Sequence, residues 1–264
     1  MEEIYSAGGG LDLALTLHDG LAGKKSGRVY LDEFCKDKSI DLVKIRHINE
    51  SEAISAIRAH EIGWLFIIGW SQIAGPEALT APTRGVLGIH PTLLPEGRGR
   101  APIPWAILKG LRQTGVTLFK LDTGVDTGDI LAQEVVEIAP DETATTLYSR
   151  VNDSHRSIIQ DTWPLLAADT VRAFPQDESK ATYWEARTPD DGRITPDMEV
   201  EFVERLVRAT THPYPGAFYE GEPGTILRIW SGRIGDEHQA NAAGTERITL
   251  VNGVYDAVDF AWES

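Results

Sequence analysis

The sequence is poor in three features that would indicate particular classes of protein. Its one cysteine, Cys35, can form no disulfide within the chain, as in proteins of reducing compartments. No apolar run reaches the roughly 18 residues of a membrane-spanning helix, and the first residues lack the basic and apolar regions of a signal peptide. Lysine and arginine number 25 against 40 aspartates and glutamates, which argues against extended binding to a phosphate backbone. We therefore expect a cytoplasmic protein without a nucleic-acid or membrane partner.

The composition that remains is that of an ordinary globular protein. Hydrophobic residues make up 42% and charged residues 25% of the 264 residues, which suits one α/β domain with a small appendage. Cys35 lies in a predicted helix beside acidic residues, which raise the pKa of a thiol. We interpret it as a packing residue rather than a nucleophile.

Strands and helices are predicted to alternate along most of the chain. Apolar runs predict strands near residues 11–17, 40–45, 63–69, 85–90, 115–121 and 129–137. Amphipathic spacing predicts helices near residues 29–36, 50–59, 101–111, 141–173 and 198–210. This alternation predicts a Rossmann-like, mostly parallel sheet with helices on both faces.

Both ends of the chain depart from that pattern. Three glycines at residues 8–10 are interpreted as a helix end, since they lack the spacing of a phosphate-binding loop. The chain would thus open within a helix, where an α/β sheet normally begins with a buried strand. We predict a catalytic domain over residues 1–173, a linker and helix over 174–218, and a small β-rich subdomain over 219–264.

Three polar loops follow strands of the predicted sheet. His90 ends one strand, Asp122 and Asp126 follow another, and residues 70–73 follow a third. Ligands of open α/β sheets bind beyond the carboxyl ends of the strands, and a histidine beside a carboxylate suits general acid–base catalysis. No metal is expected, because one histidine without nearby cysteines makes a poor zinc site. The residues alone leave open whether His90 is catalytic or structural. His155, on the predicted long helix, is interpreted as packed or solvated.

Two of these loops resemble a known family. Residues 88–102, Gly-Ile-His-Pro-Thr-Leu-Leu-Pro-Glu-Gly-Arg-Gly-Arg-Ala-Pro, and residues 122–129, Asp-Thr-Gly-Val-Asp-Thr-Gly-Asp, are similar to the N10-formyltetrahydrofolate-dependent formyltransferases. Residues 189–194 and 208–218 resemble the segment after the catalytic domain in members that act on methionyl-tRNA or nucleotide sugars. These two segments argue against the family member of the purine pathway, glycinamide ribonucleotide formyltransferase. The whole resemblance covers about residues 11 to 218.

The resemblance implies roles for matching residues. His90 would be the acid–base, and Asp126 would keep its imidazole charged. The pterin of N10-formyltetrahydrofolate would lie against two loop segments, which contain Trp70, Ser71, Gln72, Ile73, Gly124 and Val125. Arg100, with Arg98 in the same Arg-Gly-Arg-Ala-Pro run, would lie beside the substrate. The resemblance also suggests a homodimer.

The sequence departs from the family at two points. Gly88 stands where the catalytic Asn-x-His motif has asparagine, and losing one oxyanion donor costs on the order of 10²–10³ in rate. Gln72, Thr92 or a backbone amide could replace that donor. The first strand and most of the first helix of the family's fold are also expected to be missing.

Three hypotheses follow from these observations. The leading one is a sugar N-formyltransferase that acts on a nucleotide-linked amino sugar, favoured by the acidic charge, the short appendage and the run from Arg98 to Trp105. The second is a methionyl-tRNA formyltransferase, which would need a larger, basic C-terminal domain. The third is a degenerate member that binds folate or a nucleotide sugar without turnover, and Gly88 motivates it.

Overall fold

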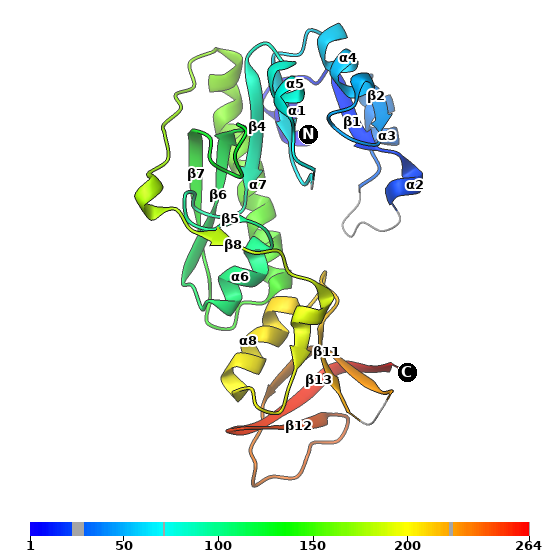
Figure 1. Cartoon of the computed structure of the whole chain (residues 1–264), viewed down its shortest axis with the longest axis vertical. Helices are drawn as coiled ribbons and strands as arrows, with labels where there is room; N and C mark the ends of the chain where they lie inside the picture. The colour runs from blue at the N-terminus through cyan, green and yellow to red at the C-terminus, as the bar shows by residue number, and fades with distance from the viewer. Residues whose placement is uncertain (23–28, 71, 222–223, 264) are drawn as a thin grey trace. The chain divides into compact units, whose positions relative to one another are not determined.

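The chain forms two compact units, each built from separate stretches of sequence (Figure 1). The computed structural model describes residues 1–22, 29–70, 72–221 and 224–263. Unit 1 contains Met1–Arg98, Gly115–Glu134 and Asp153–Tyr183, and unit 2 contains Gly99–Thr114, Val135–Asn152 and Trp184–Ser264. The predicted boundaries at residues 173 and 218 stay a prediction, because the units follow spatial contacts rather than chain order.

The larger sheet is mixed, so the prediction of a mostly parallel sheet is wrong. Its strand order is β3-β4-β6-β7, formed by β3 (Trp64–Ile67), β4 (Gly85–His90), β6 (Gln113–Lys120) and β7 (Ile130–Glu137). β3 is parallel to β4, whereas β6 is antiparallel to it, with His90 opposite Thr117. A parallel return needs a crossover that packs back on the sheet. The stretch between β4 and β6 supplies none, because Gly99–Thr114 belongs to unit 2.

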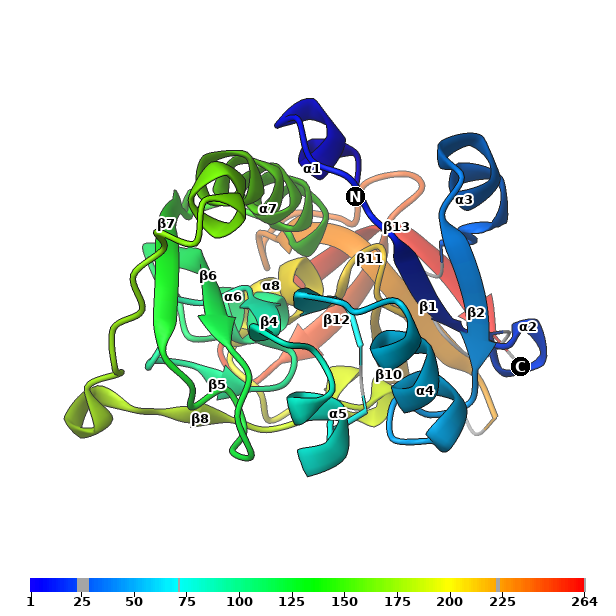
Figure 2. The ribbon, with the colours of Figure 1, turned by 90° about the horizontal axis from the view of Figure 1, so that it is seen from above.

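A second, separate sheet of two strands lies near the N-terminus. β1 (Leu13–Leu17) is parallel to β2 (Asp41–Ile45). Helices α3 (Asp32–Lys38) and α4 (Ser51–Ala59) lie on opposite faces of this pair (Figure 2). The strand predicted near residues 11–17 is confirmed, and its side chains alternate: Leu13 packs toward α4, and Ala14 packs toward Cys35 of α3. Burial raises the pKa of the Cys35 thiol, in keeping with its predicted packing role.

Shorter helices complete unit 1. The predicted helix end at the N-terminus is α1 (Glu2–Ser6), and Gly8 follows it with a φ of 80°. Helix α2 (Asp19–Ala22) precedes the first residues that are not described, and α5 (Pro76–Thr80) precedes β4.

The long helix α7 (Ala144–Ala167) contributes to both units. Thr143 caps the start of this helix, because the Thr146 amide donates to Thr143 Oγ1 at 3.3 Å. The helix ends earlier than predicted, before a turn in which Asp169 has a φ of 56°. The predicted linker that follows contains the short turns η1 (Glu178–Lys180) and η2 (Pro189–Gly192). No helix among the described residues combines the length and apolar character needed to cross a membrane.

Unit 2 contains the predicted C-terminal β-rich part. Its five-stranded sheet has the order β12-β13-β11-β10-β9. The strands are β12 (Glu246–Leu250), β13 (Gly253–Glu263), β11 (Ile226–Ile234), β10 (Ala217–Glu220) and β9 (Arg193–Ile194). Helix α8 (Val200–Thr210) buries Val203, Leu206 and Val207 against this sheet, and α6 (Pro102–Leu108) packs on α8.

Candidate active site

His90 is the last residue of β4 and is held in a buried loop. Its side chain is 7% exposed, and its Nε2 lies 2.8 Å from the carbonyl oxygen of Gly97. The loop that follows is fixed by Thr117 of β6, whose hydroxyl donates to the Thr92 carbonyl and accepts from the Leu94 amide. Because Thr117 is fully buried, these hydrogen bonds lie in a low dielectric. The loop therefore presents His90 in one orientation.

The second predicted loop, residues 122–129, depends on its glycines. Asp122 accepts hydrogen bonds from the Gly124 amide and from the Thr127 hydroxyl. A Cβ at Gly124 would lie 2.0 Å from that hydroxyl oxygen, and one at Gly128 would lie 1.8 Å from the Lys120 carbonyl oxygen. Only glycine fits either position, and Asp126 between them has a φ of 56°. Residues 122–129 thus form a tight turn that contains Asp126.

The structure brings His90 and Asp126 together. The Asp126 Oδ2 lies 3.6 Å from the His90 Nδ1, with the carboxylate only 18% exposed. This separation is an ion-pair distance rather than a hydrogen bond. With Nε2 donating to a carbonyl oxygen, Nδ1 is the atom left to accept a proton. The Asp126 carboxylate thus lies beside the ring nitrogen that is available to accept a proton.

Gln176, which sequence analysis missed, connects the two loops. Its Oε1 accepts from Arg98 Nε at 3.1 Å and Nη2 at 2.8 Å. Its Nε2 donates to the carbonyl oxygens of Asp126 at 2.8 Å and Gly128 at 2.7 Å. One side chain therefore fixes the aspartate loop to the arginine of the histidine loop. Gln176 lies in a polar linker without periodicity, so no sequence signal marks it.

Arg98 proves to be a structural residue, so its predicted role beside the substrate is not supported. Its guanidinium is completely buried and also donates to Glu178 and to the Tyr183 hydroxyl. The Glu178 carboxylate raises the pKa of Arg98 further above its ordinary range. With its donors used within unit 1, Arg98 has none left for a ligand. Arg100 is exposed and lies in unit 2, where its amide donates to the Trp184 carbonyl.

His155 of α7, interpreted as packed or solvated, proves to be packed. Burial, with a further contribution from the charge of His90, lowers the pKa of His155 to about 4. Among the described residues, its buried Nε2 has no hydrogen-bond partner. A neutral imidazole therefore lies near the proposed acid–base. The signal was present, because Val151 and Ile158 place His155 on the buried face of α7.

The loop after β3 is held by Gln72. Its Oε1 accepts from the Trp70 indole and the Ile48 amide, and its Nε2 donates to the Arg46 carbonyl. Gln72 is thus committed to the connection between β2 and α4 and cannot replace the missing oxyanion donor. Ser71 lies outside the described residues. Two predicted pterin-binding side chains are apolar and solvent-facing, Ile73 at 67% and Val125 at 49% exposed.

An asparagine side chain at Gly88 would require neighbouring side chains to shift. A Cβ there would lie 2.8 Å from Leu121 Cδ2 and 3.1 Å from Phe119 Cε1. Its peptide groups belong to a strand that pairs with β3 on one edge and with β6 on the other. The Thr92 hydroxyl is buried without a partner among the described residues, so it cannot reach a substrate in this arrangement. Of the three candidates for the oxyanion donor, namely Gln72, Thr92 and a backbone amide, the backbone amide remains.

Two family matches show that the chain is an enzyme of the formyltransferase class. The chain belongs to the formyl transferase family, because residues 31–163 match the family model described as formyl transferase. Residues 187–255 match the model of the formyl transferase C-terminal domain. The family is folate-binding, so the predicted formyltransferase resemblance is confirmed.

Solved structures share this fold at low sequence identity. A methionyl-tRNA formyltransferase from Clostridium thermocellum has a TM-score of 0.65 and 20% identity, over 96% of this chain and 99% of that one. An N-formyltransferase from Helicobacter canadensis, in complex with folinic acid and dTDP-3-aminofucose, has a TM-score of 0.67 and 16% identity. The match covers 95% of this chain and 100% of that one. HypX from Aquifex aeolicus, in complex with tetrahydrofolic acid, has a TM-score of 0.71 and 16% identity. The match covers 95% of this chain but only 44% of that one. At these identities the likeness concerns the fold alone.

Proposed function

We propose that this chain transfers the formyl group of N10-formyltetrahydrofolate to the amino group of a nucleotide-linked amino sugar. The observation that carries the proposal is the pairing of the buried His90 with the half-buried Asp126 in a chain of the formyltransferase family. A histidine and a carboxylate at 3.6 Å provide the proton acceptor that attack by an amine requires.

The proposed step needs one proton acceptor and one oxyanion donor. The amine nitrogen forms a bond to the formyl carbon, and the carbonyl oxygen becomes an oxyanion. His90 Nδ1 takes the proton released by the amine, and Asp126 stabilises the resulting imidazolium. As the bond from carbon to N10 of the folate breaks, the same proton passes to that nitrogen. Atoms and charge balance without a metal.

The solvent-facing side chains of these two loops offer apolar contact to the face of a planar ring. Ile73 and Val125 expose aliphatic side chains that a pterin would cover. The backbone of Gly124 and Val125 would then supply polar groups, while Trp70 and Gln72 hold their loop in place. These assignments concern binding rather than the chemical step.

The charge of the C-terminal part favours a sugar over a tRNA. The residues after Phe218 contain eight acidic side chains, namely Glu220, Glu222, Asp236, Glu237, Glu246, Asp256, Asp259 and Glu263. The same stretch contains three arginines, Arg228, Arg233 and Arg247. Arg228 forms an ion pair with Glu263, and Arg247 forms one with Asp256. Because a tRNA backbone is gripped by clustered cations, this surface is poorly suited to it.

Release of tetrahydrofolate tests the proposal. The protein is incubated with N10-formyltetrahydrofolate and 3-amino or 4-amino sugars linked to dTDP, UDP or GDP. We expect turnover with at least one sugar, and loss of about 10²-fold or more in His90→Ala and Asp126→Ala. Turnover with methionyl-tRNA instead would establish the second function. Folate binding without any turnover would show a degenerate member, and full activity of either variant would refute the site.

A further inference from the structure

The carbonyl oxygen of Gly97 decides which ring nitrogen of His90 carries a proton. His90 Nε2 lies 2.8 Å from that oxygen, and a carbonyl oxygen can only accept, so Nε2 carries the proton of the neutral ring. The hydrogen bond that one ring nitrogen makes sets the tautomer of a histidine. Nδ1, which lies 3.6 Å from Asp126, is then the unprotonated nitrogen. Whatever fixes the direction of the Gly97 carbonyl therefore fixes the tautomer of His90.

Gly97 has a backbone that hydrogen bonds must hold in place. Its φ of 72° lies in the left-handed region, which glycine adopts without strain. Because glycine lacks a Cβ, the peptide groups on either side of it rotate more freely than at other residues. Gly97 is also buried, where peptide groups need hydrogen-bond partners. The partners of its two peptide groups therefore set the direction of the carbonyl that meets His90.

Thr182 binds the peptide groups on both sides of the Gly97 Cα. Its hydroxyl oxygen accepts a hydrogen bond from the Gly97 amide at 2.8 Å. Its carbonyl oxygen accepts one from the Arg98 amide at 2.9 Å. Because a peptide bond is planar, the Arg98 N–H and the Gly97 C=O belong to one rigid group. Thr182 thus holds one end of the peptide group whose other end is bound to His90.

The first half of the same loop is held by other residues. Gln133 of β7 donates to the Leu94 carbonyl at 2.8 Å and to the Thr117 hydroxyl at 2.9 Å. The next contact along the loop again comes from Thr182, whose amide donates to the Pro95 carbonyl at 3.2 Å. The loop is therefore fixed at both ends, and Thr182 holds the end that touches the imidazole.

We propose that Thr182 is a positioning residue for the acid–base His90. It acts through the Gly97 carbonyl, which keeps the proton of the neutral imidazole on Nε2 and leaves Nδ1 to take the proton of the attacking amine. The catalytic part of this role rests on the proposed function, whereas the tautomer does not. Without the Thr182 hydroxyl, the Gly97 peptide groups can turn and the ring proton can move to Nδ1, beside Asp126. A ring protonated there has no Nδ1 lone pair for the amine proton.

The tautomer can be measured in the complete chain without a substrate. NMR of isotopically labelled imidazole nitrogens distinguishes the two neutral tautomers, and His90→Ala identifies the signals of His90. At a pH where the ring is neutral, we expect Nε2–H in the parent chain and in Thr182→Ser, which keeps the hydroxyl. Thr182→Val keeps the shape but not the hydroxyl, and should shift the tautomer ratio about tenfold towards Nδ1–H, the effect of one lost hydrogen bond.

The valine substitution leaves the core intact, because the Thr182 side chain is exposed. Thr182→Ala gives the same test should the valine variant not fold. Thr80→Val is the matched control, since it removes a hydroxyl that donates to the Pro76 carbonyl at 2.8 Å in α5. It should leave the tautomer of His90 and the rate of formyl transfer at their parental values.

Kinetics give a second readout that a purely structural contact would not produce. Thr182→Val should lower the kcat of formyl transfer about tenfold, while the KM for the sugar stays within about twofold. Thr182→Ser should restore the parental kcat, because its hydroxyl can accept from the Gly97 amide.

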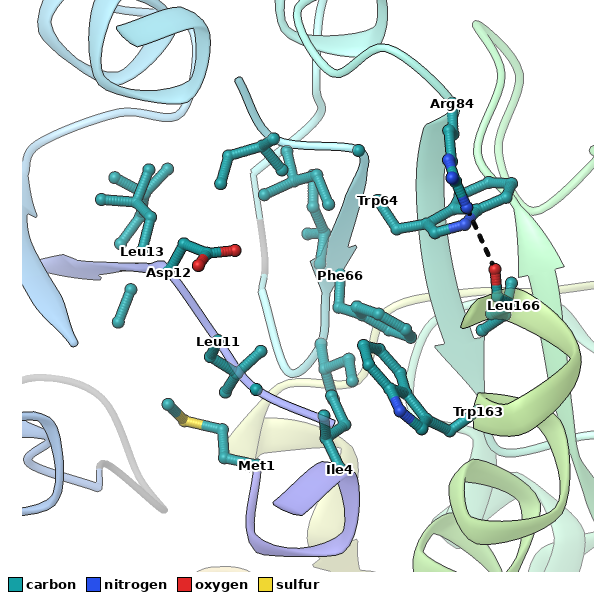
Figure 3. Close-up of a pocket in the computed structure, with 18 of the residues that line it drawn as sticks. Met1, Ile4, Leu11, Asp12, Leu13, Trp64, Phe66, Arg84, Trp163 and Leu166 are labelled. Atoms are coloured by element: carbon teal, nitrogen blue, oxygen red, sulfur yellow. Dashed lines mark hydrogen bonds between the residues drawn. The ribbon is translucent and has the colours of Figure 1, made fainter. Parts of the chain in front are cut away.

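Hydrogen exchange shows whether the change stays local. In Thr182→Val the Gly97 and Arg98 amides should exchange about tenfold faster, because these are the amides that Thr182 binds. Residues 63–68 serve as the reference in unit 1. They line a cavity that, among the described residues, none of residues 91–98 borders (Figure 3). Their exchange should not change.

Two results would overturn the proposal. One is the Nδ1–H tautomer in the parent chain, and the other is a parental tautomer and kcat in Thr182→Val. Failure of the proposed function has a different signature: no sugar is formylated, yet the tautomer of His90 still depends on the Thr182 hydroxyl.

Discussion

Replacing Gln176 by glutamate separates the two functions of that side chain. Glutamate keeps an oxygen for Arg98 but loses the N–H groups that donate to the carbonyls of Asp126 and Gly128. Each buried carbonyl left without its donor costs about 1–3 kcal/mol, and a stronger contact with Arg98 offsets part of this. We expect a net loss of about 2–3 kcal/mol in the free energy of unfolding.

Three measurements follow from this estimate. The apparent melting temperature should fall by roughly 4–12 °C, at about 2–4 °C per kcal/mol for a chain of this size. Hydrogen exchange over residues 122–129 should quicken, because the loop loses its connection to the arginine. The kcat/KM for formyl transfer should fall about tenfold or more, since a displacement of 1 Å in a catalytic group can cost about 10².

Gln113→Glu is the matched control. It makes the same chemical change at an exposed position of β6 and should stay within about 0.5 kcal/mol of the parent chain. If Gln176→Glu left both the melting temperature and loop exchange at parental values, Gln176 would not hold the aspartate loop.

Three further predictions concern neighbouring residues. The folded pKa of His155, about 4, lies below its ordinary 6.5, so its contribution to stability is present above pH 6.5 and lost as the pH falls toward 4. In urea unfolding, the free energy of unfolding should fall by about 1–2 kcal/mol between pH 7 and 5, and this fall should be smaller in His155→Gln. Identical pH profiles for the parent chain and the variant would contradict this. Gly88→Asn should destabilise by about 1–3 kcal/mol through its contact with Leu121, and Leu121→Ala in the same chain should relieve part of that loss in a melting curve. Arg98→Lys should lower the melting temperature without a selective rise in the KM for the sugar; a KM effect alone would restore Arg98 as a substrate contact.

The local pattern of the sequence predicted most elements and the centre of the site. An apolar run located β1, and the paired motifs contain His90 and Asp126, whose loops meet in the structure. Strand direction was the main error, because an apolar run such as β6 reads the same in either direction. The argument that all three loops share the carboxyl edge therefore failed for the aspartate loop. Its own turn, rather than the strand direction, returns Asp126 to His90.

Contacts between residues distant in sequence explain what was missed. Gln176 lies 78 positions from Arg98 and 50 from Asp126, so neither charge nor spacing links them in the sequence. Arg98 was assigned to the substrate through its place in the Arg-Gly-Arg-Ala-Pro run that resembles the family, but here it is fully buried. His155 was interpreted as packed or solvated, and helical spacing along α7 could have decided for the packed side chain that the structure shows.

Gly88 bears directly on the choice between an enzyme and a binding protein. Had the chain simply lost an asparagine, the position would be expected to leave a void, and voids are costly in cores. Instead, Leu121 and Phe119 fill the space to within contact of a missing Cβ. The surrounding residues are thus adapted to glycine, and an oxyanion donor, if the enzyme is active, must come from elsewhere. Since Gln72 is engaged and Thr92 is enclosed, a backbone amide is the donor we expect. Turnover in the parent chain that falls in Gly88→Asn would support this adaptation, whereas higher turnover in that variant would show that the asparagine had been lost from a working site.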